Sequence, residues 1–239
     1  MSVVATSLCK VATCIVFLIS ICFTSCILAN ENLTIDSPNG RIKLTFSIKG
    51  GIAQYQVFHD SVELITPSKL GFKLHSQANI LNNFSLKSSH VEEVDAPWGK
   101  VWGQSSLAEN HYRQLKVELS ESTEFPRQLN IYFRVFDDGL GFRYEFPEQD
   151  NLKNFAIVSE ETEFVLAADH TAWWIPADYD SYEYLYQQTL LSELSSANTP
   201  ITLKTEHGLF LSIHEAALTN YAGMTLTKSE ASSLSFKSE

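Results

Sequence analysis

Cysteine is absent from most of this sequence. All four cysteines (Cys9, Cys14, Cys22 and Cys26) lie near the start of the 239 residues. The remainder therefore has no disulfide and no thiolate metal site, and its own core must stabilise it. Basic residues are also scarce, because 17 Lys and Arg stand against 28 Asp and Glu, which gives a formal net charge of −11. Without a basic cluster, we do not expect a nucleic acid as a partner.

The first thirty residues contain a long apolar run. An uncharged stretch follows Lys10 and ends at Ala29. This pattern is typical of a secretion signal, here residues 1–29. We therefore expect an exported protein, periplasmic or secreted, with no membrane span after cleavage. Two alternatives stay open: cleavage before Cys26 would leave a lipid anchor, and about 19 apolar residues also suffice for an uncleaved anchor.

Short strands separated by turn residues dominate the rest of the sequence. Turn signals such as Gly50-Gly51 and Asp137-Asp138-Gly139 punctuate it, and only Tyr182 to Leu194 could carry a turn or two of helix. This pattern, without repeats or βαβ alternation, predicts an all-β fold: one large antiparallel two-sheet sandwich over residues 31–239. The expected strands are 41–48, 53–59, 62–65, 115–119, 129–135, 141–146, 155–158, 163–166, 201–205 and 209–214.

Three segments carry more aromatic and ionisable side chains than a plain sandwich requires. The first places Trp98 and Trp102 in a glycine-punctuated loop, shortly before Asn110-His111-Tyr112. The two tryptophan rings could stack on the apolar face of a sugar. They could equally close one end of the sandwich as buried residues.

The second segment, residues 169–184, is the densest. It holds four carboxylates, a histidine, two Trp and three Tyr. Carboxylate oxygens suit Ca²⁺ or Mg²⁺, and rings beside carboxylates suit a carbohydrate, although the spacing matches neither an EF-hand nor a zinc site. Trp173, Trp174 and Tyr182 are therefore candidate sugar contacts. A solvated loop whose aromatic residues pack locally is the alternative.

The third segment joins His214 to Glu215. Such a pair could transfer protons, but neighbouring residues on a strand point to opposite faces. We therefore expect one of the two to be structural. No nucleophile-elbow motif is visible for Ser/His/Asp chemistry.

Five motifs occur in a fixed order along the chain. Together they resemble the N-terminal domain of glycoside hydrolase family 97, which comprises α-glucosidases and α-galactosidases, over essentially all of residues 31–239. The resemblance implies a β-supersandwich of the galactose-mutarotase type. The motifs are DSPNG at 36–40, NHY at 110–112, GLGFRYEFP at 139–147, DHTAWWIP at 169–176 and HEAAL at 214–218.

The resemblance also implies which parts of an enzyme lie elsewhere. In this family the catalytic acid and the base or nucleophile lie on a (β/α)₈ barrel, and no barrel sequence is present among these residues. We therefore expect no catalytic residue here and no glycoside hydrolysis by the chain alone. Its last residues, 234–239, read as a strand in progress, so we expect a fragment of an exported α-glucosidase. The implied partners are that barrel and an α-glucan-type oligosaccharide.

A calcium role follows from the same resemblance. In calcium-dependent inverting members, a glutamate of this domain reaches Ca²⁺ at the barrel's active site. The matching pattern, Asp178-Tyr179-Asp180-Ser181-Tyr182-Glu183, makes Glu183 that ligand and favours the α-glucosidase branch. Because Ca²⁺ takes six to eight oxygen ligands, we expect binding only in a full-length enzyme.

Two other functions remain as hypotheses. The aromatic segments around Trp98, Trp102, Trp173 and Trp174 would suit a free-standing carbohydrate-binding module. The expected architecture also hosts mutarotase-like epimerases, although fold alone is a poor guide to activity and no matching His/Glu acid–base pattern is present. Without a barrel to cover it, the region at 178–184 should expose aromatic surface.

Overall fold

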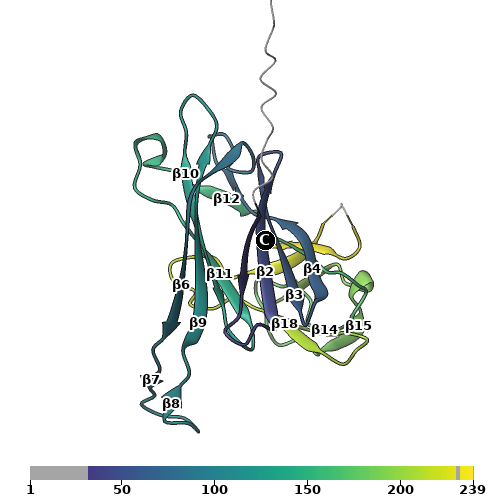
Figure 1. Ribbon diagram of the computed structural model, residues 1–239. Helices are drawn as coiled ribbons and strands as arrows, with labels where there is room; N and C mark the ends of the chain where they lie inside the picture. The colour runs from purple at the N-terminus through teal and green to yellow at the C-terminus, as the bar shows by residue number, and fades with distance from the viewer. Residues whose placement is uncertain (1–31, 230–231, 239) are drawn as a thin grey trace, which may run out of the picture.

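The computed structural model describes residues 32–229 and 232–238, so the expected signal segment lies outside the described residues (Figure 1). Within these ranges the chain is almost entirely antiparallel β-sheet. The helices are two short 3₁₀ turns, η1 (Asp150–Leu152) and η2 (Leu191–Glu193). No helix in the described part is long and apolar enough to cross a membrane.

The first layer begins as a four-stranded meander in sequence order. Its strands are β1 (Asn32–Asp36), β2 (Ile42–Lys49), β3 (Ile52–His59) and β4 (Val62–Lys69). Asp60 and Ser61 connect β3 to β4 with φ of 47° and 67°, the left-handed backbone that a two-residue hairpin turn requires. The hairpin predicted here from the sequence is therefore confirmed.

A second sheet packs on this meander in the order β11-β10-β9-β6. Its strands are β6 (Phe84–Asp95), β9 (His111–Glu121), β10 (Gln128–Val135) and β11 (Leu140–Glu145). Phe133 on β10 contacts Phe46 and Tyr55 across the layers, with ring centroids 5.9 and 6.5 Å apart. All three rings are buried, because alternate residues of each strand point inward. The structure thus confirms the predicted two-layer antiparallel sandwich.

The first layer continues beyond β4 with strands from much later in the chain. β13 (Glu163–Val165) lies beside β4, where the Ala167 N–H donates to the Leu64 carbonyl at 3.1 Å and the Val165 N–H donates to Ser68 Oγ at 2.9 Å. β20 (Ser235–Ser238), β19 (Thr225–Lys228) and β16 (Ser196–Asn198) follow in that order.

The remaining strands form a pair and another four-stranded sheet. β5 (Phe72–Leu74) pairs with β12 (Ile157–Glu160). β15 (Gln187–Leu190), β14 (Thr171–Trp174), β17 (Ile201–Lys204) and β18 (Phe210–Ile213) make the sheet in that order. The stretch in which we expected a turn or two of helix thus holds β15 and the single turn η2, because its middle part, Gln187–Leu190, pairs with β14.

The hairpin of β6 and β9 extends past the sandwich as an arm (Figure 1). At its tip, β7 (Trp98–Gly99) pairs with β8 (Leu107–Ala108). Trp98 is 57% exposed and Trp102 is 86% exposed. The hypothesis that these two tryptophans close one end of the sandwich is therefore wrong, and sugar stacking remains a prediction.

Candidate functional site

The candidate site is the loop at 175–186, which leaves β14 and returns as β15. Trp174 pairs with Gln187, so both ends of the loop start from the same end of the sheet. The Tyr182 hydroxyl donates to the Thr199 carbonyl at 2.9 Å. This bond ties the loop to the residues just before β17.

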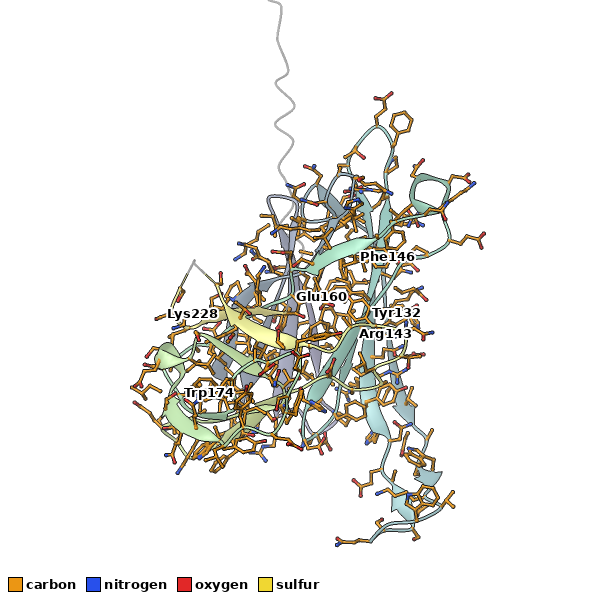
Figure 2. All side chains as sticks on the ribbon, turned by 180° about the vertical axis from the view of Figure 1, so that it is seen from behind. Tyr132, Arg143, Phe146, Glu160, Trp174 and Lys228 are labelled. Atoms are coloured by element: carbon orange, nitrogen blue, oxygen red, sulfur yellow. The ribbon has the colours of Figure 1, made fainter. Side chains whose placement is uncertain are left out.

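Trp173 and Trp174 point to opposite faces of β14, as successive strand residues do. Trp174 is 7% exposed, and its Nε1–H donates to Thr189 Oγ1 at 3.1 Å; Figure 2 shows it within its sheet. Trp173 is half-buried and packs against Phe210, with centroids 6.0 Å apart. The ring of Trp174 is covered by other core residues, so a sugar could not reach it in this structure. Its position therefore argues against the prediction that Trp174 contacts a sugar.

An internal hydrogen-bond network shapes the loop. Asp178 Oδ1 accepts the Asp180 N–H at 2.8 Å, and Oδ2 accepts the Tyr184 hydroxyl in a short bond. The Tyr184 bond lowers the pKa of Asp178 and raises the pKa of Tyr184, because it favours the charged carboxylate and the protonated phenol. Asp178 therefore acts as an internal brace of the loop.

Glu183 presents an exposed side chain, and its backbone N–H donates to Ser181 Oγ at 3.2 Å. In the described ranges, no group of three or more His, Cys, Asp or Glu residues could hold a metal ion. A Ca²⁺ ion needs several oxygen ligands, of which Glu183 by itself could supply only part.

The loop also exposes the aromatic surface expected from the sequence. Tyr179 is fully exposed, Leu185 is 89% exposed, and Tyr182 and Tyr186 are mainly exposed. Large exposed apolar patches mark interaction surfaces. The loop therefore has the chemistry of a contact surface that contains two exposed carboxylates, Asp180 and Glu183.

His170 and Asp169, which precede the two tryptophans, are structural. Asp169 accepts the Ser192 N–H at 2.9 Å and the Ser192 hydroxyl at 2.7 Å. The His170 carbonyl accepts the Leu191 N–H at 2.9 Å. Both residues therefore hold η2 in place. Sequence reasoning had grouped them with the loop chemistry.

The other motifs have structural roles as well. Glu215 accepts the Met224 N–H at 3.0 Å while His214 is exposed, so the expectation that one of this pair is structural is confirmed. Tyr112 is buried against Phe136, with centroids 5.1 Å apart. Asn39 closes the β1–β2 turn by accepting the Arg41 N–H at 2.9 Å.

A large groove lies apart from this loop, between β11 and β18, with a volume of about 1830 Å³. Sequence reasoning missed it. A strand can be predicted from its own residues, but a groove between two strands depends on which strands do not pair with each other. Local sequence patterns do not indicate which strands these are.

Comparison with known proteins places these features in a family. The family described as "Glycosyl-hydrolase 97 N-terminal" matches residues 35–239. A curated retaining alpha-galactosidase of Bacteroides thetaiotaomicron is 26% identical over 217 residues, which cover 84% of this chain and 31% of that protein.

Solved structures agree with this match. A Glycoside Hydrolase Family 97 enzyme from Pseudoalteromonas sp. strain K8, in complex with acarbose, matches with a TM-score of 0.83 and 32% identity over 87% of this chain and 31% of that one. A beta-arabinopyranosidase shares the fold at 19% identity, with a TM-score of 0.79 over 87% of this chain and 35% of that one. This chain thus spans about a third of the length of these proteins.

Proposed function

We propose, given that this chain belongs to glycoside hydrolase family 97 and corresponds to its N-terminal domain, that the loop at 175–186 forms one wall of an active site shared with a catalytic (β/α)₈ barrel. The exposed rings and the exposed carboxylates of this loop carry the proposal, because such a surface is incomplete by itself. The chain supplies binding and positioning groups, and the barrel supplies the catalytic acid and base.

Glu183 is the residue we assign to Ca²⁺ in that shared site. Its carboxylate is exposed, and the bond between Asp178 and Tyr184 fixes the loop that carries it. When bound, Ca²⁺ polarises water or orients a sugar oxygen. Glu183 contributes one oxygen ligand, and carboxylates of the barrel contribute the others.

The proposed substrate is an α-glucan-type oligosaccharide. Tyr182 is exposed next to Glu183 in the sequence, and Trp173 is half-buried, so both offer ring surface that suits the apolar face of a sugar. The Pseudoalteromonas relative was solved with acarbose and, as an E480Q variant, with panose. The retaining alpha-galactosidase relative makes α-galactosides the alternative.

Export completes the proposal. The apolar segment at 1–29 supports secretion to the periplasm or beyond, with a lipid anchor at Cys26 as the alternative. A core that contains no cysteine is compatible with the periplasm and with secretion beyond it, because it depends on no disulfide.

A domain exchange tests the shared site. Residues 32–239 would replace the aligned domain of the Pseudoalteromonas enzyme, and Glu183→Gln would then be compared with the unsubstituted chimera. We expect Ca²⁺ affinity, measured by calorimetry, to fall by about tenfold or more, since removing even an outer partner of a metal site costs 10–100-fold. Activity on maltooligosaccharides should fall in parallel.

Asp180→Asn is the matched control, because Asp180 is an exposed carboxylate of the same loop. It should leave Ca²⁺ affinity unchanged. Equal affinities for the chimera and its Glu183→Gln variant would contradict the assignment of Glu183.

A further inference from the structure

The groove between β11 and β18 is open on the outside and apolar within. Tyr55 and Val57 of β3 form part of its floor, and Phe142, Tyr144 and Phe146 form one wall. Its volume of about 1830 Å³ exceeds the roughly 300–1,000 Å³ of pockets for small ligands. Figure 2 shows Phe146 and Glu160, which belong to this region.

The β11 wall of the groove is a strand edge with which no other described strand pairs. β11 is the outermost strand of its sheet, and the Phe136 N–H donates to the Gly139 carbonyl at its start. Because ladder bonds alternate along an antiparallel pair, Gly141 and Arg143 bond to β10. The backbone groups of Phe142 and Tyr144 therefore point into the groove.

The β18 wall is a second such edge, again unpaired within residues 32–229 and 232–238. β18 is also outermost in its sheet, and the Thr205 N–H donates to the Leu209 carbonyl at the preceding turn. By the same alternation, Leu211 and Ile213 bond to β17. Phe210 and Ser212 therefore direct their backbone groups into the groove from the opposite side.

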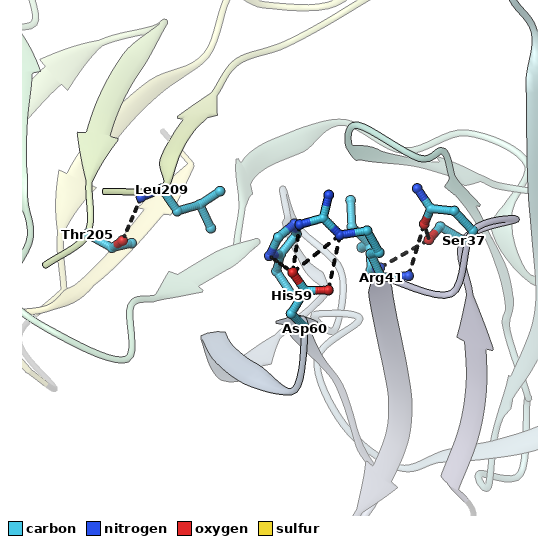
Figure 3. A network of polar contacts seen from close by, with 8 residues as sticks. Ser37, Arg41, His59, Asp60, Thr205 and Leu209 are labelled. Atoms are coloured by element: carbon cyan, nitrogen blue, oxygen red, sulfur yellow. Dashed lines mark hydrogen bonds and ion pairs between the residues drawn. The ribbon is translucent and has the colours of Figure 1, made fainter. Parts of the chain in front are cut away.

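The rims of the groove are fixed by side-chain contacts (Figure 3). Arg41 and His59 line it from the first layer, and Arg41 forms an ion pair with Asp60 at 2.6 Å. On the β18 side, the Leu209 N–H donates to Thr205 Oγ1 at 3.1 Å. The ion pair thus lies at the first-layer rim of the groove, and the Thr205 contact braces the turn that leads into β18.

Four polar side chains inside the groove bond to one another. Glu160 accepts the Thr162 hydroxyl at 2.5 Å and the Tyr221 hydroxyl at 3.0 Å, and Tyr144 lies 2.6 Å from Thr162 between hydroxyl oxygens. Beside this network, the backbone groups of the two strand edges face the groove, and these are the groups that an added β-strand recognises.

We propose that this groove receives a β-strand supplied by the polypeptide that follows β20 in full-length enzymes of the family. Ser238, at the end of β20, lines the groove, so polypeptide beyond it would emerge there. The relatives have ample length for this role, because this chain covers only 31% of them. An inserted strand would pair with both edges and cover the rings of Phe142 and Tyr144. The surface differs from the loop at 175–186, so this inference is independent of the proposed function.

Synthetic peptides test the inference directly. Overlapping peptides of about 15 residues, long enough for one strand, would cover the segment that follows the aligned region in the Pseudoalteromonas enzyme. We expect one of them to bind the protein saturably and to slow hydrogen exchange at 140–146 and 209–214. Absence of binding by every peptide, or protection confined to other segments, would overturn the proposal.

Ser212→Pro provides the specific variant. Proline removes an N–H that points into the groove, and proline is tolerated at a strand edge, so the ladder to β17 stays intact. Peptide binding should weaken about tenfold or more. Ser212→Ala is the control for the lost hydroxyl bond to the Ile201 carbonyl and should bind normally.

Two outcomes with these variants would overturn the proposal. The first is that Ser212→Pro binds the peptide as tightly as Ser212→Ala. The second is that sedimentation shows the unliganded protein to be a dimer that Ser212→Pro dissociates, because a second copy of the chain would then occupy the groove.

Discussion

A buried histidine, His170, should make the stability of this domain depend on pH. His170 is 6% exposed, and neither ring nitrogen has a hydrogen-bond partner among the described residues. Burial lowers the pKa of His170 below its ordinary value near 6.5, while Asp169 and Glu206 act in the opposite direction. The folded protein therefore favours the neutral ring.

We expect this group to weaken folding as the pH falls below about 6.5, toward the lower pKa of the folded state. In that window the unfolded chain binds a proton that the folded chain does not, so acid favours unfolding. His170→Leu removes the ionisable group at similar volume. Between about pH 7.5 and pH 5, the urea midpoint of the parent should therefore fall further than that of His170→Leu. Parallel pH dependences would contradict the prediction.

At the scale of elements, the turn between β2 and β3 depends on two glycines that differ in their surroundings. Gly50 and Gly51 have φ of 57° and 79°. A Cβ at Gly50 would meet nothing within 4 Å, whereas one at Gly51 would lie 2.9 Å from the Asn83 backbone nitrogen. The Phe84 N–H also donates to the Gly51 carbonyl at 2.8 Å, so this turn anchors the start of β6.

Alanine substitutions separate backbone conformation from close approach. Gly50→Ala should cost about 1–2 kcal/mol, the price of left-handed backbone for a residue with a Cβ. Gly51→Ala should cost more, because the Asn83 backbone must also move. Chemical denaturation of both variants measures the difference. Equal losses in the free energy of unfolding would show that the close contact between Gly51 and the start of β6 does not affect stability.

Sequence patterns predicted the elements that close locally. The β3–β4 hairpin and the turn at Asp137-Asp138-Gly139 are encoded by adjacent residues, and both are present. β6 was missed because most of it is exposed, so LKSSHVEEVD shows no apolar alternation. The pairing of β13 with β4 could not be predicted from the sequence either, because it depends on tertiary packing.

The sequence predicted which residue types make up the candidate site, but not how their side chains are arranged. The exposed rings of the loop were expected, but Trp173 and Trp174 were treated as a pair. Their strand, β14, was not predicted, and strand alternation sends one of the two rings into the core. The internal roles of Asp169 and Asp178 depend on partners that only the folded chain brings close.

At the scale of the whole molecule, the exposed loop should make the isolated domain prone to association. Tyr179, Leu185 and Tyr186 present apolar surface to solvent, and such patches promote contact between copies. Replacing all three by serine should reduce concentration-dependent association in sedimentation velocity. Phe125→Ser is the control, since Phe125 is 67% exposed in a different loop. A parent protein that stays monomeric at high concentration would contradict this expectation.

The seam between β4 and β13 has a consequence for folding kinetics. The hydrogen bond from the Val165 N–H to Ser68 Oγ joins residues 97 positions apart. Contacts between residues so far apart in sequence form slowly, because closing the intervening chain costs conformational entropy before the contact adds any stability. The meander of β1 to β4 and the hairpins of β9, β10 and β11 close through neighbours in sequence. Local contacts can form early in these two units and in the pairs β14–β15, β17–β18 and β19–β20, whereas the seam between β4 and β13 forms only after the long intervening chain has closed.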